Sequence, residues 1–84
     1  MRIWVDADAC PREIEELLLR VAERRRIPVL LVANRALAPR RPELVSTVRV
    51  GSESDAADRY IGAHVVSGDL VVTADVPLAA AAVA

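Results

Sequence analysis

Short apolar runs and helically spaced apolar positions follow one another along the chain and divide it into strands and helices. Short stretches of apolar residues predict buried strands, and these stretches are 2–5, 29–33, 44–50 and 70–73. Apolar residues at i, i+3, i+4 and i+7 predict amphipathic helices over 11–25 and 54–66. We expect Gly68 to end the second helix and Pro77 to begin a third.

The spacing also predicts which side of each helix faces the core. In the first helix one side carries four apolar residues, which are Ile14, Leu17, Leu18 and Val21. We expect this side to pack on the sheet. In the second helix one side carries Ala57, Tyr60, Ile61, His64 and Val65. We therefore expect His64 to pack or to cap the helix end, and Trp4 in the first strand to lie in the core.

The order of the elements predicts the topology. Strand, helix, strand, strand, helix and strand over 84 residues indicate one α/β domain, with a small, mainly parallel sheet and helices on both faces. Right-handed crossovers give the strand order 3-2-1-4 most simply. The chain then leaves strand 1 toward strand 2, while strand 4 lies on the other side. The crevice between the carboxyl ends of strands 1 and 4 is the topological switch point, where ligands bind in open α/β sheets.

Composition and charge limit which binding partners and which cellular location we expect for the chain. The formal net charge is −1, so no global positive field attracts nucleic acid or an anionic membrane. No apolar run approaches the roughly 18 residues of a membrane span, and the start of the chain lacks the apolar stretch of a signal peptide. A single cysteine forms no internal disulfide, so a cytoplasmic location is expected. The alanine-rich stretch 76–84 resembles an unfinished helix, and a homodimer is one way to cover it.

Five aspartates are expected near the switch point. Asp6 and Asp8 follow strand 1 and Asp75 follows strand 4. Asp55 and Asp58 lie in the first turn of the second helix. Like charges this close repel one another unless a cation neutralises them, and oxygen ligands favour Mg²⁺ or Mn²⁺ over zinc. Because such an ion clamps phosphate esters and orients water, we expect a metal-dependent phosphoesterase site with these five residues as metal ligands.

Each of these carboxylates also has a structural interpretation. Asp8 could cap the first helix, and Asp75 could cap the third. Asp55 and Asp58 could simply favour the positive end of the second helix. Asp6, which ends a strand, has the weakest structural explanation, so it is the strongest candidate for a metal ligand.

Other residues lie at the same edge or near it. Asn34 and Arg35 follow strand 2 and Thr73 ends strand 4, so we expect these three to contact substrate. Cys10 is expected to be a packing or helix-capping thiol, because a C-x5-R phosphate loop would need arginine at position 16, which is glutamate. Asp69 begins strand 4 at the opposite edge, where we expect a turn residue.

Four sequence strings point to a known family. WVDADACP, LVAN, SDAADRYI and GDLVVTADVPLA, in this order and spacing, strongly resemble the YaiI/YqxD family of uncharacterised bacterial proteins. The resemblance covers essentially all 84 residues. Members of that family continue well beyond this length, so the resemblance implies a chain that is truncated at its carboxyl end.

The YaiI/YqxD family is similar to the PIN-like nuclease superfamily. PIN-like proteins carry an aspartate after strand 1, a D-x-x-I helix and a T-x-D motif after the last core strand. These correspond here to Asp6, to Asp58 with Ile61, and to Thr73 with Asp75. The resemblance implies a PIN-like fold, Asp6, Asp58 and Asp75 as catalytic residues, bound Mg²⁺ or Mn²⁺, and cleavage of RNA phosphodiesters.

Two interpretations compete with the nuclease. A D-x-D pair after strand 1 is also typical of haloacid-dehalogenase-like phosphatases, with Asp6 as nucleophile and Asp8 as general acid, although the chain has no lysine to bind phosphate. The other alternative is a non-catalytic metal- or RNA-binding module or a degenerate domain, since neither Glu43 nor Glu53 falls in the helix that usually adds a further acid in PIN nucleases. The sequence leaves open whether the chain is an enzyme; if it is, we expect a hydrolase.

Overall fold

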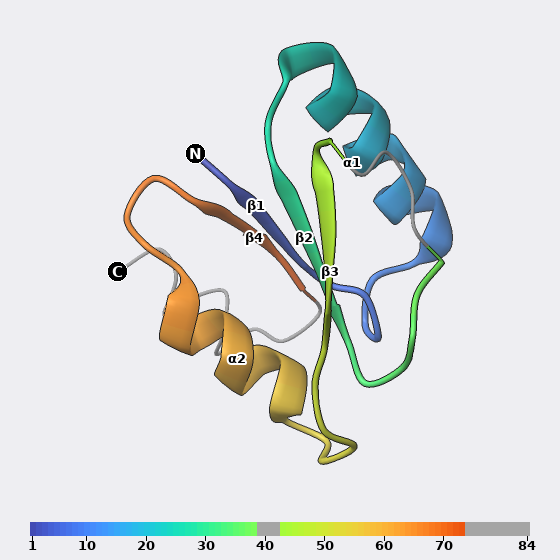
Figure 1. Ribbon diagram of the computed structural model, residues 1–84, viewed down its shortest axis with the longest axis vertical. Coiled ribbons are helices and arrows are strands. Elements are labelled where there is room, and N and C mark those ends of the chain that lie inside the picture. The colour runs from blue at the N-terminus through green and yellow to red at the C-terminus, as the bar shows by residue number, and fades with distance from the viewer. Residues whose placement is uncertain (39–42, 74–84) are drawn as a thin grey trace.

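A computed structural model of the chain describes residues 1–38 and 43–73 (Figure 1). In chain order the elements are β1 (Ile3–Asp6), α1 (Arg12–Arg25), β2 (Val29–Ala33), β3 (Val45–Arg49), α2 (Ala56–His64) and β4 (Leu70–Val72). The four strands and two helices predicted within these residues are all present. None of the helices in the described ranges is long and apolar enough to cross a membrane.

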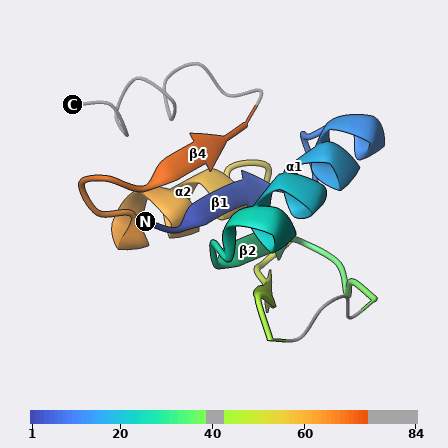
Figure 2. The same cartoon turned by 90° about the horizontal axis from the view of Figure 1, so that it is seen from above.

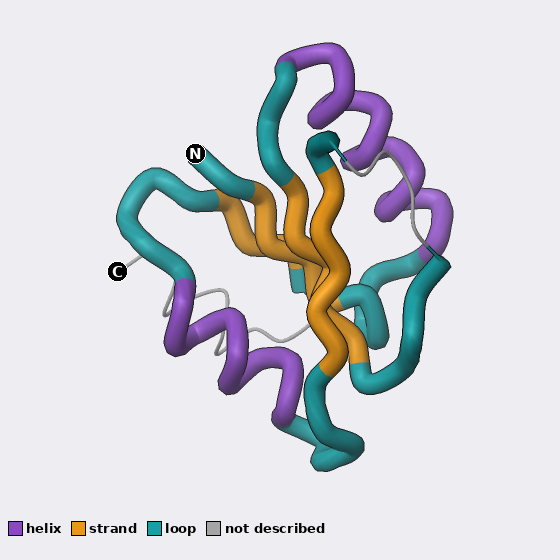
Figure 3. The backbone as a smooth tube through the Cα atoms, in the orientation of Figure 1, coloured by secondary structure: helices purple, strands orange, loops and turns teal. Residues whose placement is uncertain are grey.

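The four strands form one parallel sheet in the order β3-β2-β1-β4 (Figure 3). Ile3 of β1 pairs with Val29 of β2 on one side and with Leu70 of β4 on the other. The carboxyl end of β1 therefore lies between those of β2 and β4. This order confirms the predicted α/β fold and places the switch point between β1 and β4.

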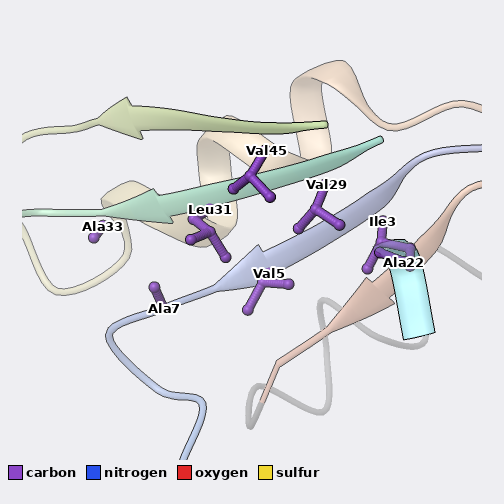
Figure 4. Close-up of a cluster of buried hydrophobic side chains, with 8 residues drawn as sticks. All are labelled: Ile3, Val5, Ala7, Ala22, Val29, Leu31, Ala33 and Val45. Atoms are coloured by element: carbon purple, nitrogen blue, oxygen red, sulfur yellow. The ribbon is translucent and has the colours of Figure 1, made fainter. Parts of the chain in front are cut away.

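The two helices lie on opposite sides of the sheet (Figure 2), as predicted. We call these sides the α1 face and the α2 face. On the α1 face, alternate residues of β1 and β2 form a buried layer with Ala22 of α1 (Figure 4). Ile3 and Val5 represent β1 in this layer, and Val29 and Leu31 represent β2. The continuous apolar runs of the strands are explained by this burial on both faces.

On the α2 face, Trp4 of β1 packs with Val32 of β2 against Ile61 of α2. Trp4 is thus a core residue, as predicted. The ring of His64 stacks on that of Tyr60 with the centroids 4.1 Å apart, and His64 Nδ1 lies 2.8 Å from the carbonyl oxygen of Tyr60. His64 therefore packs at the end of α2, also as predicted.

The predicted orientation of α1 is wrong in part. Three of the four apolar residues expected to face the core are exposed, namely Ile14, Leu17 and Val21. Instead, Ala22 is buried, with Leu18 and Leu19 partly buried beside it. The apolar residues of α1 span a wider arc than the side of the helix that contacts the sheet, so the residues at one edge of this arc remain exposed to solvent.

The end of α2 also differs from the prediction. The helix ends at His64, and Val65 already has an extended backbone. Gly68 does not end the helix; it lies in the turn before β4 with a φ of 93°, a conformation that favours glycine. The predicted third helix, from Pro77, lies outside the described residues.

At the amino end of the sheet, Asp69 ties β4 to β1. Its carboxylate, which is 3% exposed, accepts hydrogen bonds from Trp4 Nε1 at 2.9 Å and from the Val66 N–H at 3.2 Å. The backbone N–H of Arg2 donates at 3.0 Å and its guanidinium at 3.2 Å. Burial alone would raise the pKa of Asp69, but these hydrogen bonds and the charge of Arg2 lower it to about 2.

Candidate functional site at the carboxyl edge

Asp6 ends β1 at the carboxyl edge of the sheet, and the residue is 7% exposed. Its Oδ2 accepts a hydrogen bond from Thr73 Oγ1, 3.4 Å away at the end of β4. Its Oδ1 accepts one from the backbone N–H of Asp8 at 3.2 Å. The structure therefore brings Asp6 and Thr73 together at the switch point.

Burial has the largest effect on the pKa of the Asp6 carboxyl. Loss of solvation raises the pKa of this carboxyl, and the charge of Asp8 raises it further. The backbone N–H groups of Asp8 and Ala9 and the hydroxyl of Thr73 oppose this effect, but the pKa stays above its usual value. Within residues 1–38 and 43–73, no basic side chain forms an ion pair with Asp6. A cation arriving from solvent would therefore supply the missing countercharge.

Asp8 turns toward β2 and away from the contact between Asp6 and Thr73. Its Oδ2 accepts a hydrogen bond from the backbone N–H of Asn34 at 2.7 Å, and its Oδ1 lies 3.6 Å from Arg35 Nε. Asn34 and Arg35 are thus brought to the same edge, as their positions after β2 suggest. The capping interpretation of Asp8 is wrong, because Pro11 is the N-cap residue of α1 and no side chain caps it.

Asp55 and Asp58 lie at the start of α2. Asp55 occupies the N-cap position without a side-chain capping bond and forms an ion pair with Arg59, 3.3 Å away. Asp58 lies half-buried in the first turn, where the helix dipole favours negative charge. These positions give both residues structural roles along their own helix.

The described residues do not assemble a complete acidic cluster. In the two described stretches, no three histidine, cysteine, aspartate or glutamate side chains are grouped so that they could hold a metal ion. The structure therefore does not bring any three of Asp6, Asp8, Asp55 and Asp58 into one site. The fifth predicted ligand, Asp75, lies outside the described residues.

The donor chemistry of this edge nevertheless suits one hard cation. Mg²⁺ keeps several of its waters and is usually held by one or two carboxylates rather than by a full protein cage. Asp6 supplies one such carboxylate, and the other predicted donors are also oxygen atoms, which Mg²⁺ and Mn²⁺ prefer. Asp6 thus has the donor chemistry of one protein ligand to such an ion.

A pocket of about 230 Å³ opens on the α1 face of the same edge. Arg12 and Glu15 of α1 form one wall and Arg35 another, over a floor that includes Ala7 and Leu31. Sequence reasoning missed Arg12 and Glu15. The signal that could have found them is their position, since the first turn of a helix after β1 must lie at the carboxyl edge.

Cys10 also lines this pocket, but it does not have the properties of a nucleophile. Its side chain packs partly buried against the α1-face core, in agreement with the predicted packing role. Burial raises the pKa of the Cys10 thiol, and the charges of Glu15 and Asp6 raise it further. The thiol is therefore protonated at neutral pH, whereas nucleophilic cysteines have a lowered pKa.

Comparison with known proteins finds one family. The family described as "Uncharacterized BCR, YaiI/YqxD family" matches residues 4–84. A UPF0178 protein of Geobacter metallireducens is 56% identical over 84 residues, which are 100% of this chain and 54% of that protein. A UPF0178 protein of Acidithiobacillus ferrooxidans is 53% identical over 81 residues, covering 96% of this chain and 55% of the relative. The chain thus spans about half the length of the curated relatives it matches. No solved structure matches it.

Proposed function

Because this chain belongs to the YaiI/YqxD family, whose members are described as uncharacterised, we propose its function from its own site: a Mg²⁺- or Mn²⁺-dependent phosphoesterase that hydrolyses RNA phosphodiesters. The observation that carries this proposal is the carboxylate of Asp6. It lies buried at the carboxyl end of a central parallel strand, at the switch point between β1 and β4. Ligands bind at this position in open α/β sheets.

Structural needs explain Asp6 poorly. The carboxylate accepts a hydrogen bond from the backbone N–H of Asp8 in the turn after β1, a role that a neutral asparagine could also fill. A buried charge without a basic partner destabilises a fold. Asp6 caps no helix, and within the described residues it has no ion-pair partner. A functional requirement for a carboxylate at this point accounts for its presence.

The proposed ion is held by Asp6, with Asp75 as the second principal ligand and Asp58 as a further acid of the site. Asp8 and Asp55 are left out of this ligand set, because Asp8 pairs with Asn34 and Arg35 and Asp55 pairs with Arg59. A bound divalent ion would neutralise phosphate charge and lower the pKa of an attacking water. The support for this assignment is the oxygen-only donor set and the resemblance of the motifs around Asp6, Asp58 and Asp75 to PIN-like nucleases.

The chain's own residues would position the acid and the substrate. The hydroxyl of Thr73 holds one oxygen of Asp6, which fixes the direction of the carboxylate at the edge. Arg35 is 58% exposed, and Asp8 lies against its guanidinium. An arginine oriented in this way can form paired hydrogen bonds with a phosphate group. We propose that Arg35 and the neighbouring Asn34 contact the RNA backbone.

The D-x-D phosphatase is not favoured by this geometry. In that mechanism both carboxylates act on one phosphate, one as nucleophile and the other as general acid. Here Asp6 is bonded to Thr73 on the β4 side, whereas Asp8 is bonded to the Asn34 N–H on the β2 side. The nuclease does not require Asp6 and Asp8 to act on one phosphate, so we adopt it.

RNA cleavage tests this proposal directly. The wild-type chain, Asp6→Asn and Glu16→Gln are incubated with single-stranded and structured RNA in Mn²⁺. Glu16 is a matched control because it is an exposed carboxylate on α1. We expect cleavage by the wild type and by Glu16→Gln, and a loss of about 100-fold in Asp6→Asn. Equal cleavage by Asp6→Asn would contradict the proposal and identify a contaminant. Binding of Mn²⁺ and RNA without cleavage would establish the non-catalytic module instead.

A further inference from the structure

One flank of α1 carries large apolar side chains that nothing in the described structure buries. Ile14 is 44% exposed, Leu17 is 52% exposed and Val21 is 44% exposed. They follow the spacing i, i+3 and i+7, so they form a continuous stripe along the helix. Three such residues in one stripe differ from the single exposed apolar residues that are normal on protein surfaces.

The stripe faces the β4 side of the sheet. The opposite flank of α1, with Arg12 and Glu15, borders the pocket whose other wall follows β2. Between the two flanks, Leu18 and Ala22 face the sheet. Because successive helix residues are rotated by about 100°, the stripe must lie on the side away from that pocket.

The uncovered part of the α1 face continues onto β4. Leu70 pairs with Ile3, so its side chain shares the α1 face, and it is 42% exposed. Val72, the other β4 residue on this face, packs against the α1-face core, so the exposed part of β4 is the end that carries Leu70. Ile14, Leu17 and Val21 of α1 together with Leu70 of β4 form what we call the apolar corner, the angle between a helix flank and an open strip of sheet.

We propose that the apolar corner is the docking surface for an amphipathic helix. This helix belongs to the part of the relatives' polypeptide that lies outside the stretch matched by this chain. This chain corresponds to only 54% of the Geobacter metallireducens relative, so almost as much polypeptide again must pack somewhere in that protein. An α/β sheet buries its faces under helices, and a helix with an apolar stripe fits an apolar groove. The apolar corner offers an exposed apolar surface beside α1 for such a stripe.

A second copy of this chain fits the corner less well. The α1 of a second copy is already backed by its own sheet, so its stripe can meet the stripe of the first α1. To cover Leu70 as well, the second copy would have to place a further element in the angle between α1 and β4. A helix not yet packed on a sheet has no such restriction, which is why we assign the corner to the remaining part of the family's polypeptide.

The test compares the accessibility of the corner with and without that part. The part of the Geobacter metallireducens relative that the match leaves out is joined to this chain by a flexible linker, in the order in which the relative carries it. In a Cys10→Ser background, Leu17→Cys places a single thiol in the apolar corner. Arg20→Cys places a matched thiol on the exposed side of the same helix. The rate of reaction with a thiol reagent is measured for both variants, fused and unfused.

The fusion is expected to slow the reaction of Leu17→Cys by about tenfold or more and to leave that of Arg20→Cys unchanged. Equal rates at Leu17→Cys in the fused and unfused proteins would overturn the proposal. A rate in the unfused chain that falls as its concentration rises would overturn it too, by assigning the corner to a second copy. If the fusion does not fold, hydrogen exchange decides the question. The stretch of the complete Geobacter protein that matches 12–25 must then exchange more slowly than α1 in this chain.

Discussion

Replacing Asp69 with asparagine tests how the amino end of the sheet is held together. Asparagine keeps an oxygen that can accept the hydrogen bond from Trp4 Nε1, but it removes the charge that also attracts Arg2. The substitution therefore removes the charge and one of the two acceptor oxygens, the one that accepts from the backbone N–H of Arg2, and leaves the shape of the site nearly unchanged. We expect Asp69→Asn to fold and to be less stable than the wild type at neutral pH.

The magnitude follows from the pKa of Asp69. Its lowering from 3.8 to about 2 is equivalent to about 2 kcal/mol of stability. Arg2 is 39% exposed, so solvent screens its share of this energy. We therefore expect Asp69→Asn to lower the free energy of unfolding by about 1 to 2 kcal/mol at pH 7. Because the folded-state pKa is lowered, this contribution is complete above pH 3.8 and is lost as the pH falls toward 2.

Urea unfolding at several pH values measures this difference. Trp4 is the single tryptophan and donates to Asp69, so its fluorescence reports on this end of the sheet, and circular dichroism provides an independent signal. Asp55→Asn is the matched control, because Asp55 is 54% exposed in its ion pair with Arg59. The control should change the free energy of unfolding by less than about 0.5 kcal/mol. Equal losses for the two variants at pH 7, or a difference for Asp69→Asn that persists at pH 2, would refute the reasoning.

Four further substitutions test the core, the exposed flank of α1 and the carboxyl edge. Asp6→Asn should melt at the same temperature as the wild type or higher, because burial raises the pKa of Asp6 and the charged form is disfavoured in the fold; a large fall in melting temperature would assign Asp6 a structural role. Ile61→Ala should lower the free energy of unfolding by about 2 to 5 kcal/mol, since Ile61 is fully buried, whereas Leu17→Ala should lower it by less than about 0.5 kcal/mol; urea titration of both checks the assigned burial. Arg35→Gln should weaken RNA binding and leave Mn²⁺ affinity unchanged, because Arg35 pairs with Asp8 rather than with Asp6; a parallel loss of metal affinity in calorimetry would contradict this separation.

Strand order was predictable from the sequence because it depends on general constraints. Buried strands need continuous apolar runs, such as the one over 29–33, and right-handed crossovers leave few arrangements of four strands. The position of Asp6 at the switch point follows from that order alone. Side-chain directions at a strand end depend on local turns instead, and for that reason the divergence of Asp6 and Asp8 did not follow from their spacing.

Two features could not be determined from the pattern of apolar residues: which side of α1 is buried, and the role of Asp69. Periodicity identifies an apolar arc on α1 but does not tell which part of it the sheet covers, so Leu17 was placed in the core although it is exposed. Asp69 was expected only as a turn residue. A signal was present, because a buried indole N–H needs an acceptor and Asp69 precedes the strand that pairs with the strand of Trp4.

A crystal structure of the wild-type chain soaked in Mn²⁺ would show whether Asp6 anchors a divalent cation at the switch point. We expect an anomalous scattering peak at the carboxyl edge, about 2.2 Å from a carboxylate oxygen of Asp6, and no such peak in crystals of Asp6→Asn. A wild-type structure with no ion at Asp6, or with the ion bound only elsewhere, would contradict this expectation.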